Sequence, residues 1–200
     1  MRIISGEFRG RQLKTTTGPG YRPAMGKVRG ALFSMLEARG LLWPETRVLD
    51  VFAGSGSLGF EALSRGAAEA LFIESLPKAA ALLRENAEKL GLAPQRYHIV
   101  NEEAGKALNR PAARPFDLIF IDPPYRRNLL APTVKAILRR GWLAPEGIIN
   151  AEVEGGLKFD PAKETPGLAV LADREYGQTR VVLWTRNIEC PSSTPALSTR

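Results

Sequence analysis

The stretch VLDVFAGSGSLGFEAL, residues 48–63, decides the fold of this 200-residue chain. Its first six residues form a run of strand length that is apolar except for Asp50. The spacing G-x-G-x-x-G follows at residues 54–59 and leads into a helical pattern. In a strand–turn–helix context this spacing predicts a ligand site, because the glycines let the backbone approach a bound nucleotide-like molecule. The spacing alone does not distinguish NAD, FAD and S-adenosylmethionine.

Asp50, just before the glycine turn, favours S-adenosylmethionine among these ligands. A carboxylate there would repel a pyrophosphate, but it suits a ligand that carries an ammonium and a sulfonium group. Glu74 ends the next apolar run, at a position where an acid accepts hydrogen bonds from ribose hydroxyls. The structural alternatives are a turn or capping role for Asp50 and a solvated strand end for Glu74.

A second motif lies in FDLIFIDPPY, residues 116–125, where an apolar run ends in an acid, two prolines and an aromatic residue. The Asp122 carboxylate is an acceptor, and the carbonyl groups around Pro123 and Pro124 have no competing proline N–H beside them. Such a cluster favours the NH2 group of a nucleobase, on which Tyr125 would stack. The alternative is a buried strand stopped by Pro-Pro, with Asp122 capping the next helix.

Strand and helix patterns alternate along the rest of the chain, which predicts an α/β fold with a doubly wound, mostly parallel, Rossmann-like sheet of seven strands. A helical pattern starts at Lys27, and the residues around 168–184 predict an antiparallel C-terminal hairpin. The other expected strands lie near 46–53, 70–74, 97–101, 116–121 and 147–153, and the other helices near 57–65, 77–90, 103–109 and 128–140. Ligands bind at the carboxyl ends of strands in such a sheet, so we expect Asp50, Glu74, Glu103 and Asp122 to converge on one cleft.

The positive charge of the chain is concentrated at its N-terminus. Residues 1–30 contain seven Lys and Arg against one Glu, whereas the remaining 170 residues contain 21 against 20 acids. A short basic β-hairpin is expected within residues 1–25, and its composition suits a phosphate backbone. The candidate nucleic-acid contacts are Arg9, Arg11, Lys14 and Arg22, with Arg126 and Arg127 beside the second motif. The alternatives are a solvated basic arm and a solvated helix start.

Composition restricts the other classes of function. With Cys190 and His98 as the only residues of their types, we expect no internal disulfide, no zinc site and no metal. No signal or membrane-spanning pattern is visible, so we expect a cytoplasmic protein without a membrane partner, and a monomer. Residues 1–186 are expected to form a single domain, with 26–186 as its core, and 187–200 a disordered tail.

The two motifs, in this order and spacing, resemble the S-adenosylmethionine-dependent amino methyltransferases. MRIISG at residues 1–6, FRGRQL at 8–13 and VRGALF at 28–33 narrow the resemblance to the RsmD family. That resemblance implies methylation of a guanine N2 amine in bacterial 16S ribosomal RNA, within the assembled or nearly assembled 30S subunit. It implies that Gly54, Ser55 and Gly56 hold the donor and that Glu103 meets its adenine amine. The chain departs from the family pattern at Ala24-Met25-Gly26.

Three rival functions remain open. A DNA adenine-N6 methyltransferase would use the same second motif but needs additional sequence for reading duplex bases. A glutamine-N5 methyltransferase acting on proteins is disfavoured by the basic N-terminus. A non-catalytic RNA-binding or assembly protein with a vestigial donor site is suggested by the departure at residues 24–26.

Overall fold

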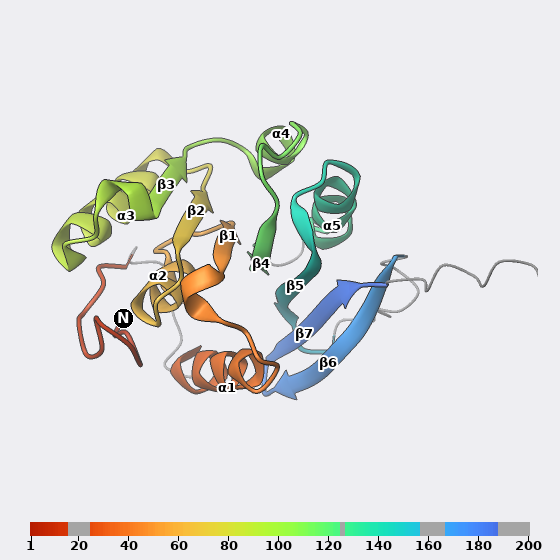
Figure 1. The fold of residues 1–200 in the computed structure, drawn as a ribbon, viewed down its shortest axis with the longest axis horizontal. Helices are drawn as coiled ribbons and strands as arrows, with labels where there is room; N and C mark the ends of the chain where they lie inside the picture. The colour runs from red at the N-terminus through yellow and green to blue at the C-terminus, as the bar shows by residue number, and fades with distance from the viewer. Residues whose placement is uncertain (16–24, 125–126, 157–166, 188–200) are drawn as a thin grey trace, which may run out of the picture.

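The computed structural model describes residues 1–15, 25–124, 127–156 and 167–187, and a seven-stranded sheet forms its centre (Figure 1). The strand order is β3-β2-β1-β4-β5-β7-β6. The first five strands in this order are parallel, and β7 runs antiparallel to both β5 and β6. The strands are β1 (Arg47–Val51), β2 (Glu69–Ile73), β3 (Tyr97–Val100), β4 (Phe116–Ile121), β5 (Leu143–Glu154), β6 (Leu168–Tyr176) and β7 (Thr179–Arg186). The predicted mostly parallel sheet with an antiparallel C-terminal hairpin is confirmed.

Helices cover both faces of this sheet. The helices are α1 (Met25–Glu37), α2 (Ser57–Ser64), α3 (Pro77–Leu90), α4 (Ala104–Leu108) and α5 (Leu130–Arg139), with short 3₁₀ turns η1 (Trp43–Glu45) and η2 (Pro94–Arg96). Apolar residues of α1, α2 and α3 form one buried cluster with Val48, Leu118 and Ile148. Those of α4 and α5 form a second cluster with Leu49 and Ile119. Neighbouring residues of one strand therefore face different helical layers, as the two-residue period of a strand requires.

The order of the strands reverses at β1. From β1 the chain proceeds to β2 and β3 on one side, and it then returns to place β4 on the other side (Figure 1). Val51 at the end of β1 pairs with Ile121 at the end of β4. The glycine stretch after β1 and the acidic motif after β4 therefore leave neighbouring strands at the same edge, which is where open α/β sheets bind ligands.

The start of β5 differs from the sequence expectation. The strand begins at Leu143 instead of residue 147, and its register with β4 shifts between the pairs Phe116–Leu143 and Leu118–Ile148. This irregular segment contains Pro145, which has no N–H to donate to a neighbouring strand. The apolar run that the sequence shows from residue 147 begins beyond the irregularity.

The N-terminal arm, residues 1–15, pairs with itself as a short antiparallel hairpin. The Ile3 N–H donates to the Arg11 carbonyl at 3.0 Å, and one bridge, between Arg2 and Gln12, is assigned. The arm is docked on the body of the protein, because Ile3, Phe8 and Leu13 are buried in the same cluster as α2 and α3. The expected basic hairpin is thus present, but it is shorter than the sequence pattern indicated.

Polar contacts with α2 hold this arm in place. The carboxylate of Glu61, fully buried, accepts hydrogen bonds from the backbone N–H groups of Ile4 and Ser5 at 2.8 and 3.1 Å. Gly6 has a φ of +83°, and a Cβ at this position would lie 1.8 Å from the Ser64 carbonyl oxygen. Only glycine lets the arm come this close to the end of α2.

Candidate functional site

The glycine loop joins β1 to α2 and has a backbone conformation that favours glycine. Gly54 and Gly56 have φ angles of +54° and +78°. A Cβ on Gly56 would lie 2.5 Å from the Phe60 ring, so this glycine is required for packing as well as for the turn. A Cβ on Gly54 would meet only the Phe52 carbonyl oxygen at 4.0 Å. The loop backbone is therefore open at Gly54, as a donor approaching the loop requires, and Ser55 beside it is half-buried.

Asp50 lies underneath this loop. One of its carboxylate oxygens accepts a hydrogen bond from the Gly59 N–H at 2.9 Å, and the residue is only 2% exposed. Burial raises the pKa of Asp50 well above its usual value, and the nearby Asp122 and Glu74 carboxylates raise it further, against the lowering effect of the Gly59 hydrogen bond. The structure thus gives Asp50 the capping contact that the sequence left as the alternative. Its role towards a donor stays a prediction.

Glu74 connects β2 to the glycine loop. Its two carboxylate oxygens accept hydrogen bonds from the N–H groups of Gly54 and Leu76, each at 2.8 Å. The residue is 7% exposed, so the carboxylate lies at the edge of the open loop and not in solvent. Each oxygen has a further lone pair, which leaves Glu74 able to accept from a ribose hydroxyl as well.

Glu103 has a different environment from the other predicted acids. It is exposed at the start of α4 and makes no side-chain capping bond there. Its neighbour Glu102 is engaged by Lys106 and Arg110, whose hydrogen bonds and positive charges lower the Glu102 pKa. Glu103 keeps its carboxylate available at the carboxyl end of β3.

Asp122 follows the last residue of β4 and is half-buried. Burial raises the pKa of Asp122 to about 6. Pro123 is buried and Pro124 is exposed, whereas Tyr125 and Arg126 lie outside the described residues. The carboxylate therefore lies at the carboxyl edge of the sheet, beside the strand that leads into the glycine loop.

Glu152 is a buried acid that the sequence reasoning missed. It lies near the end of β5, next to Asp122 in the register that pairs Ile121 with Ala151. Burial raises the pKa of Glu152 to about 8, to which Asp122 and Asp50 contribute by repulsion while Arg29 opposes them. The available signal was an acid in the mostly apolar stretch IINAEV, residues 148–153, which also contains Asn150. It belonged to no recognisable motif.

Four carboxyl groups thus meet at the carboxyl edge of the sheet, from the ends of β1, β2, β4 and β5: Asp50, Glu74, Asp122 and Glu152. Their mutual repulsion makes the site favourable for a cation and for N–H donors. Within the parts of the chain that the structure describes, no group of three or more His, Cys, Asp and Glu side chains has the arrangement of a metal site. The arrangement suits a sulfonium donor beside an amine acceptor.

The raised pKa of Glu152 predicts a pH-dependent stability. In the unfolded chain this carboxyl loses its proton near pH 4.5, whereas in the folded protein it keeps it up to about pH 8. Between these values the unfolded state binds fewer protons, so the contribution of Glu152 to stability falls as pH rises. Glutamine cannot ionise. We therefore expect Glu152→Gln to gain stability relative to the original protein from about pH 4.5 to about pH 8, measured by urea denaturation. A constant difference across this range would contradict the assigned shift.

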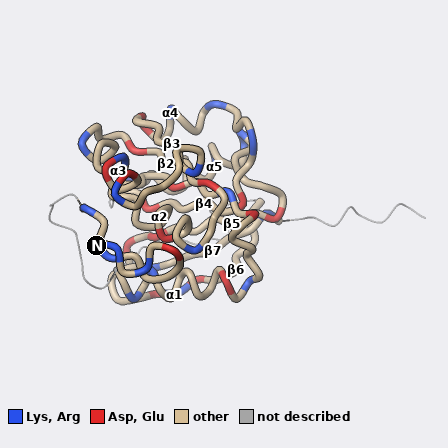
Figure 2. Tube along the Cα trace, turned by 60° about the vertical axis from the view of Figure 1, so that its left-hand side comes forward, with Lys and Arg blue, Asp and Glu red and all other residues tan. Residues whose placement is uncertain are grey.

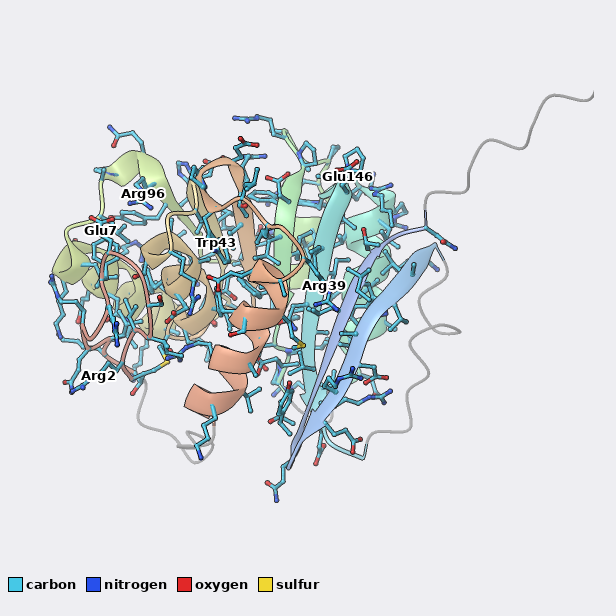
Figure 3. All side chains as sticks on the ribbon, turned by 60° about the horizontal axis from the view of Figure 1, so that its bottom comes forward. Arg2, Glu7, Arg39, Trp43, Arg96 and Glu146 are labelled. Carbon is cyan, nitrogen blue, oxygen red and sulfur yellow. The ribbon has the colours of Figure 1, made fainter. Side chains whose placement is uncertain are left out.

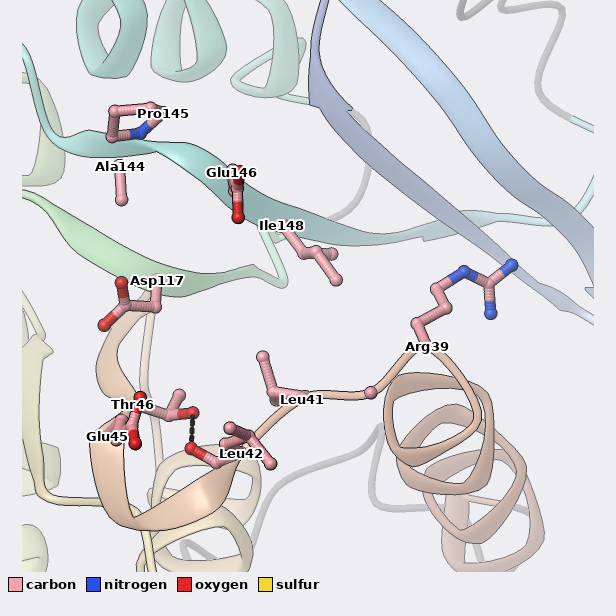
Figure 4. Close-up of a pocket in the computed structure, with 11 residues that line it drawn as sticks. Arg39, Leu41, Leu42, Glu45, Thr46, Asp117, Ala144, Pro145, Glu146 and Ile148 are labelled. Atoms are coloured by element: carbon pink, nitrogen blue, oxygen red, sulfur yellow. Dashed lines mark hydrogen bonds between the residues drawn. The ribbon is translucent and has the colours of Figure 1, made fainter.

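A cavity of about 540 Å³ lies at the opposite edge of the sheet (Figure 4). It is lined by residues that precede β1 and begin β4 and β5, among them Leu42, Thr46, Asp117 and Glu146. This cavity contains none of the four clustered carboxyl groups, so it is separate from the candidate site.

None of the helices in the described ranges is long and apolar enough to cross a membrane.

The candidate RNA-contacting residues of the arm differ in their surroundings, because some are exposed and others contact α3. Arg9 is exposed. Arg11 donates to the Lys89 carbonyl oxygen, and the Lys14 ammonium lies 2.7 Å from a Glu85 oxygen, so both side chains reach towards α3. Figure 2 shows basic residues along the arm beside α2 and α3. Arg22 lies outside the described residues, and Arg127 is exposed.

A surface ion pair also attaches the arm to the body. Glu7 lies 3.3 Å from Arg96 of η2, and Figure 3 shows these two side chains next to each other. Exposed pairs of this kind contribute little to stability, about 0–1 kcal/mol. The buried contacts of Glu61 and of the Asn86 amide, which bonds both backbone groups of Lys14, fix the arm more firmly.

Comparison with known proteins identifies similar chains over most of this sequence. A family model described as "Conserved hypothetical protein 95" matches residues 1–185. Ribosomal RNA small subunit methyltransferase D of Escherichia coli is 41% identical over 164 residues, which cover 81% of this chain and 80% of that protein. The protein of the same name from Haemophilus influenzae is 36% identical, over 77% of this chain and 79% of its own length. A solved structure described as "Putative methyltransferase yhhF from Escherichia coli" superimposes with a TM-score of 0.79 at 35% identity, covering 93% of this chain and 97% of that one.

Proposed function

Because this chain belongs to the RsmD family, whose members include the ribosomal RNA small subunit methyltransferases D, we propose that it is an S-adenosylmethionine-dependent methyltransferase of ribosomal RNA. Its target is the exocyclic N2 amine of a guanine in 16S ribosomal RNA. The observation that carries this proposal is the juxtaposition of an open glycine loop after β1 with Asp122 after the neighbouring strand β4. Donor and acceptor would then meet across the point where the strand order reverses.

The residues around the glycine loop fit the donor. S-adenosylmethionine supplies a methyl group bound to a positively charged sulfur. The open backbone at Gly54, together with Ser55 and Gly56, would hold the donor, and the carboxylate of Glu74 would accept from its ribose. The carboxylates of Glu74 and Asp122 favour its positive charge. Glu103, exposed at the end of β3, is the candidate acceptor for the adenine amine.

The residues after β4 would hold the acceptor amine. Asp122 and the carbonyl groups around Pro123 would accept hydrogens of the amine, which keeps its nitrogen lone pair directed at the methyl group. When the bond between nitrogen and the methyl carbon forms and the carbon–sulfur bond breaks, S-adenosylhomocysteine would leave, and the Asp122 carboxylate would take the surplus proton of the amine. Tyr125, outside the described residues, is proposed to stack on the base. No covalent intermediate with the protein is needed, because aligning two reactive groups already supplies much of the rate enhancement. A base within structured RNA must be unstacked or flipped to enter such a site.

The proposed partner is 16S ribosomal RNA in the assembled or nearly assembled small subunit. The exposed Arg9 of the arm and Arg127 after β4 are at the surface, where they would meet phosphates. The decisive experiment is nucleoside mass spectrometry of 16S ribosomal RNA from cells with and without the gene. We expect N2-methylguanosine at one position to disappear with the gene and to return when purified protein and S-adenosylmethionine are added. Retention of the modified nucleoside in the deletion strain contradicts the proposal.

Charge removal from the arm provides a separate prediction. Replacing Arg9, Arg11 and Lys14 together by alanine should weaken RNA binding. It should also reduce the steepness of the plot of log binding constant against log salt concentration by about 0.7–0.9 for each lost phosphate contact. Since Arg11 and Lys14 also contact α3, the single variant Arg9→Ala isolates the RNA effect. Binding to small subunits is to be measured at several salt concentrations.

The matched control is Lys135→Ala, which removes an exposed charge from α5 on the other helical layer. It should leave the salt dependence of RNA binding unchanged. If Arg9→Ala and the triple variant keep the original salt slope, these charges only solvate the arm.

The vestigial-site alternative is tested by donor binding alone. A protein that only binds RNA should show no heat of binding with S-adenosylmethionine in calorimetry, whereas the proposed enzyme should. A DNA adenine-N6 methyltransferase would methylate duplex DNA carrying adenine, and we expect no transfer to that substrate.

A further inference from the structure

We propose that Glu152 is the second carboxyl group of the acceptor site and contacts the N1–H edge of the target guanine, beside Asp122. This inference rests on the proposed function, because it names a specificity-determining residue for the base that this function methylates. The argument uses the strand register, the burial of Glu152, its lack of partners and the chemistry of guanine.

The strand register places Glu152 beside Asp122. The β4–β5 pairing runs through Phe120–Asn150 and Ile121–Ala151, and the residues that follow in each chain are Asp122 and Glu152. Ile148 belongs to the cluster covered by α1 and α2, and side chains two and four residues further along the strand share that face. Glu152 is therefore on the same face of the sheet as Asp50, which contacts α2.

The Glu152 carboxyl has no hydrogen-bond or ion-pair partner among the described residues, although the residue is only 7% exposed. The charged groups that act on it are Asp122 after β4 and Asp50 in β1, which repel it, and Arg29 in α1, which attracts it. The Arg29 guanidinium donates to the Arg2 carbonyl oxygen at 2.6 Å and lies 3.7 Å from Glu61. Buried carboxyl groups are normally bonded, so this one has capacity for a ligand.

Asn150 extends the unpaired polar surface beneath Glu152. It is fully buried on the same face of β5, and neither the oxygen nor the nitrogen of its amide has a hydrogen-bond partner in the described part of the chain. Unpaired buried polar groups are rare in native proteins and are typical of functional sites. Asn150 and Glu152 lie two residues apart on one face near the end of β5, and together they indicate a polar wall of the acceptor site.

The chemistry of guanine matches two adjacent carboxyl groups. Its Watson–Crick edge presents the N2 amine, the N1–H donor next to it and the O6 acceptor beyond. Asp122 as an anion accepts from the amine. A protonated Glu152, the form that burial and its acidic neighbours favour, accepts from N1–H through its carbonyl oxygen and donates its O–H to O6. One carboxylate and one carboxylic acid therefore read three atoms of the base.

Base analogues can test this assignment in the complete protein. Small subunits are reconstituted with ribosomal RNA that carries guanine or 2-aminopurine at the mapped position. 2-Aminopurine keeps the reactive amine but lacks both the N1–H donor and O6. The original protein should prefer guanine over 2-aminopurine in kcat/KM by about 10-fold or more, the scale of one or two hydrogen bonds.

Three substitutions separate reading of the base from a structural role. In Glu152→Met, which keeps a side chain of similar length, and in Glu152→Ala, the preference for guanine should fall to about one while the Kd of the donor stays unchanged. Glu152→Gln should restore most of the preference, because its amide oxygen accepts from N1–H and its NH2 donates to O6. The control Glu146→Ala, at the opposite end of β5, should keep the original preference.

Two results would contradict the proposals, and they distinguish failure of the Glu152 assignment from failure of the proposed function. If Glu152→Met methylates guanine and 2-aminopurine with the original ratio, the assignment of Glu152 is overturned while the proposed function stands. If the original protein transfers no methyl group to guanine N2 in these subunits, the proposed function itself fails. Should Glu152→Ala not fold, the ratio measured with Glu152→Met and Glu152→Gln decides.

Discussion

Replacement of Asp122 by alanine is expected to lower turnover by about 10²–10³-fold, the usual scale for the loss of one preorganised electrostatic group. The Asp122 carboxylate is proposed to hold the acceptor amine, whereas the proposed donor contacts come from residues after β1, β2 and β3. The Kd of the donor should therefore change by no more than about threefold. Single-turnover methylation of small subunits at saturating donor measures the first quantity, and calorimetry measures the second.

The environment of Asp122 makes this variant informative. Burial raises the pKa of the Asp122 carboxyl to about 6, so its charged form costs the folded protein free energy, and alanine should not destabilise the fold. Asp122→Asn keeps an oxygen acceptor and should lose less activity than alanine. Asp117→Ala removes a carboxylate from the other end of β4, where Asp117 accepts from the Arg47 N–H at 2.8 Å, and should turn over normally. Full activity of Asp122→Ala would exclude the amine-holding role.

The sequence predicted the core of the fold well, because its signals are local. The mostly apolar run 48–53, followed by three glycines, predicted β1, its loop and α2, and the structure explains each glycine by a contact or a φ angle. A Cβ on Gly59 would lie 2.3 Å from the Phe72 ring, so the third glycine sets how closely α2 packs on β2. The start of β5 was less predictable, because the register shift around Pro145 depends on pairing with β4.

The candidate site was predicted only in part. Glu74 and Asp122 follow strands in recognisable motifs, so their position at the carboxyl edge could be inferred from topology. Glu152 could not, because its proximity to Asp122 depends on the β4–β5 register, which no local pattern encodes. The capping bond from Gly59 to Asp50 depends likewise on how α2 packs.

The contacts of the N-terminal arm could not be predicted from its charge pattern. Its basic residues predicted a hairpin suited to a phosphate backbone, but they did not predict the contacts that attach it to α2 and α3. The buried Asn86 amide bonds both backbone groups of Lys14 and the Ser55 carbonyl oxygen in the glycine loop, at 2.8 to 3.2 Å. These contacts join residues more than 70 positions apart for Lys14, and composition contains no information about them.

Glu74→Ala is expected to weaken donor binding by about 10- to 150-fold, which corresponds to about 1.5–3 kcal/mol for hydrogen bonds to a charged group. Two physical effects contribute to this loss. Glu74 is proposed to accept from the ribose hydroxyls of the donor, and it also holds the loop through the Gly54 and Leu76 N–H groups. Calorimetry with S-adenosylhomocysteine measures the total change in Kd, and binding of RNA without donor should hardly change.

A double-mutant cycle separates the two effects of Glu74. The second ligand is an analogue of S-adenosylhomocysteine that lacks the ribose hydroxyls. If Glu74 contacts the ribose, the original protein binds the analogue more weakly than the parent ligand, whereas Glu74→Ala binds both with similar Kd. If Glu74 acts only by shaping the loop, both ligands lose affinity by the same factor and the coupling is zero. An unaltered Kd for the parent ligand would remove Glu74 from the donor site, because neither the loop contact nor the ribose contact would then contribute to binding.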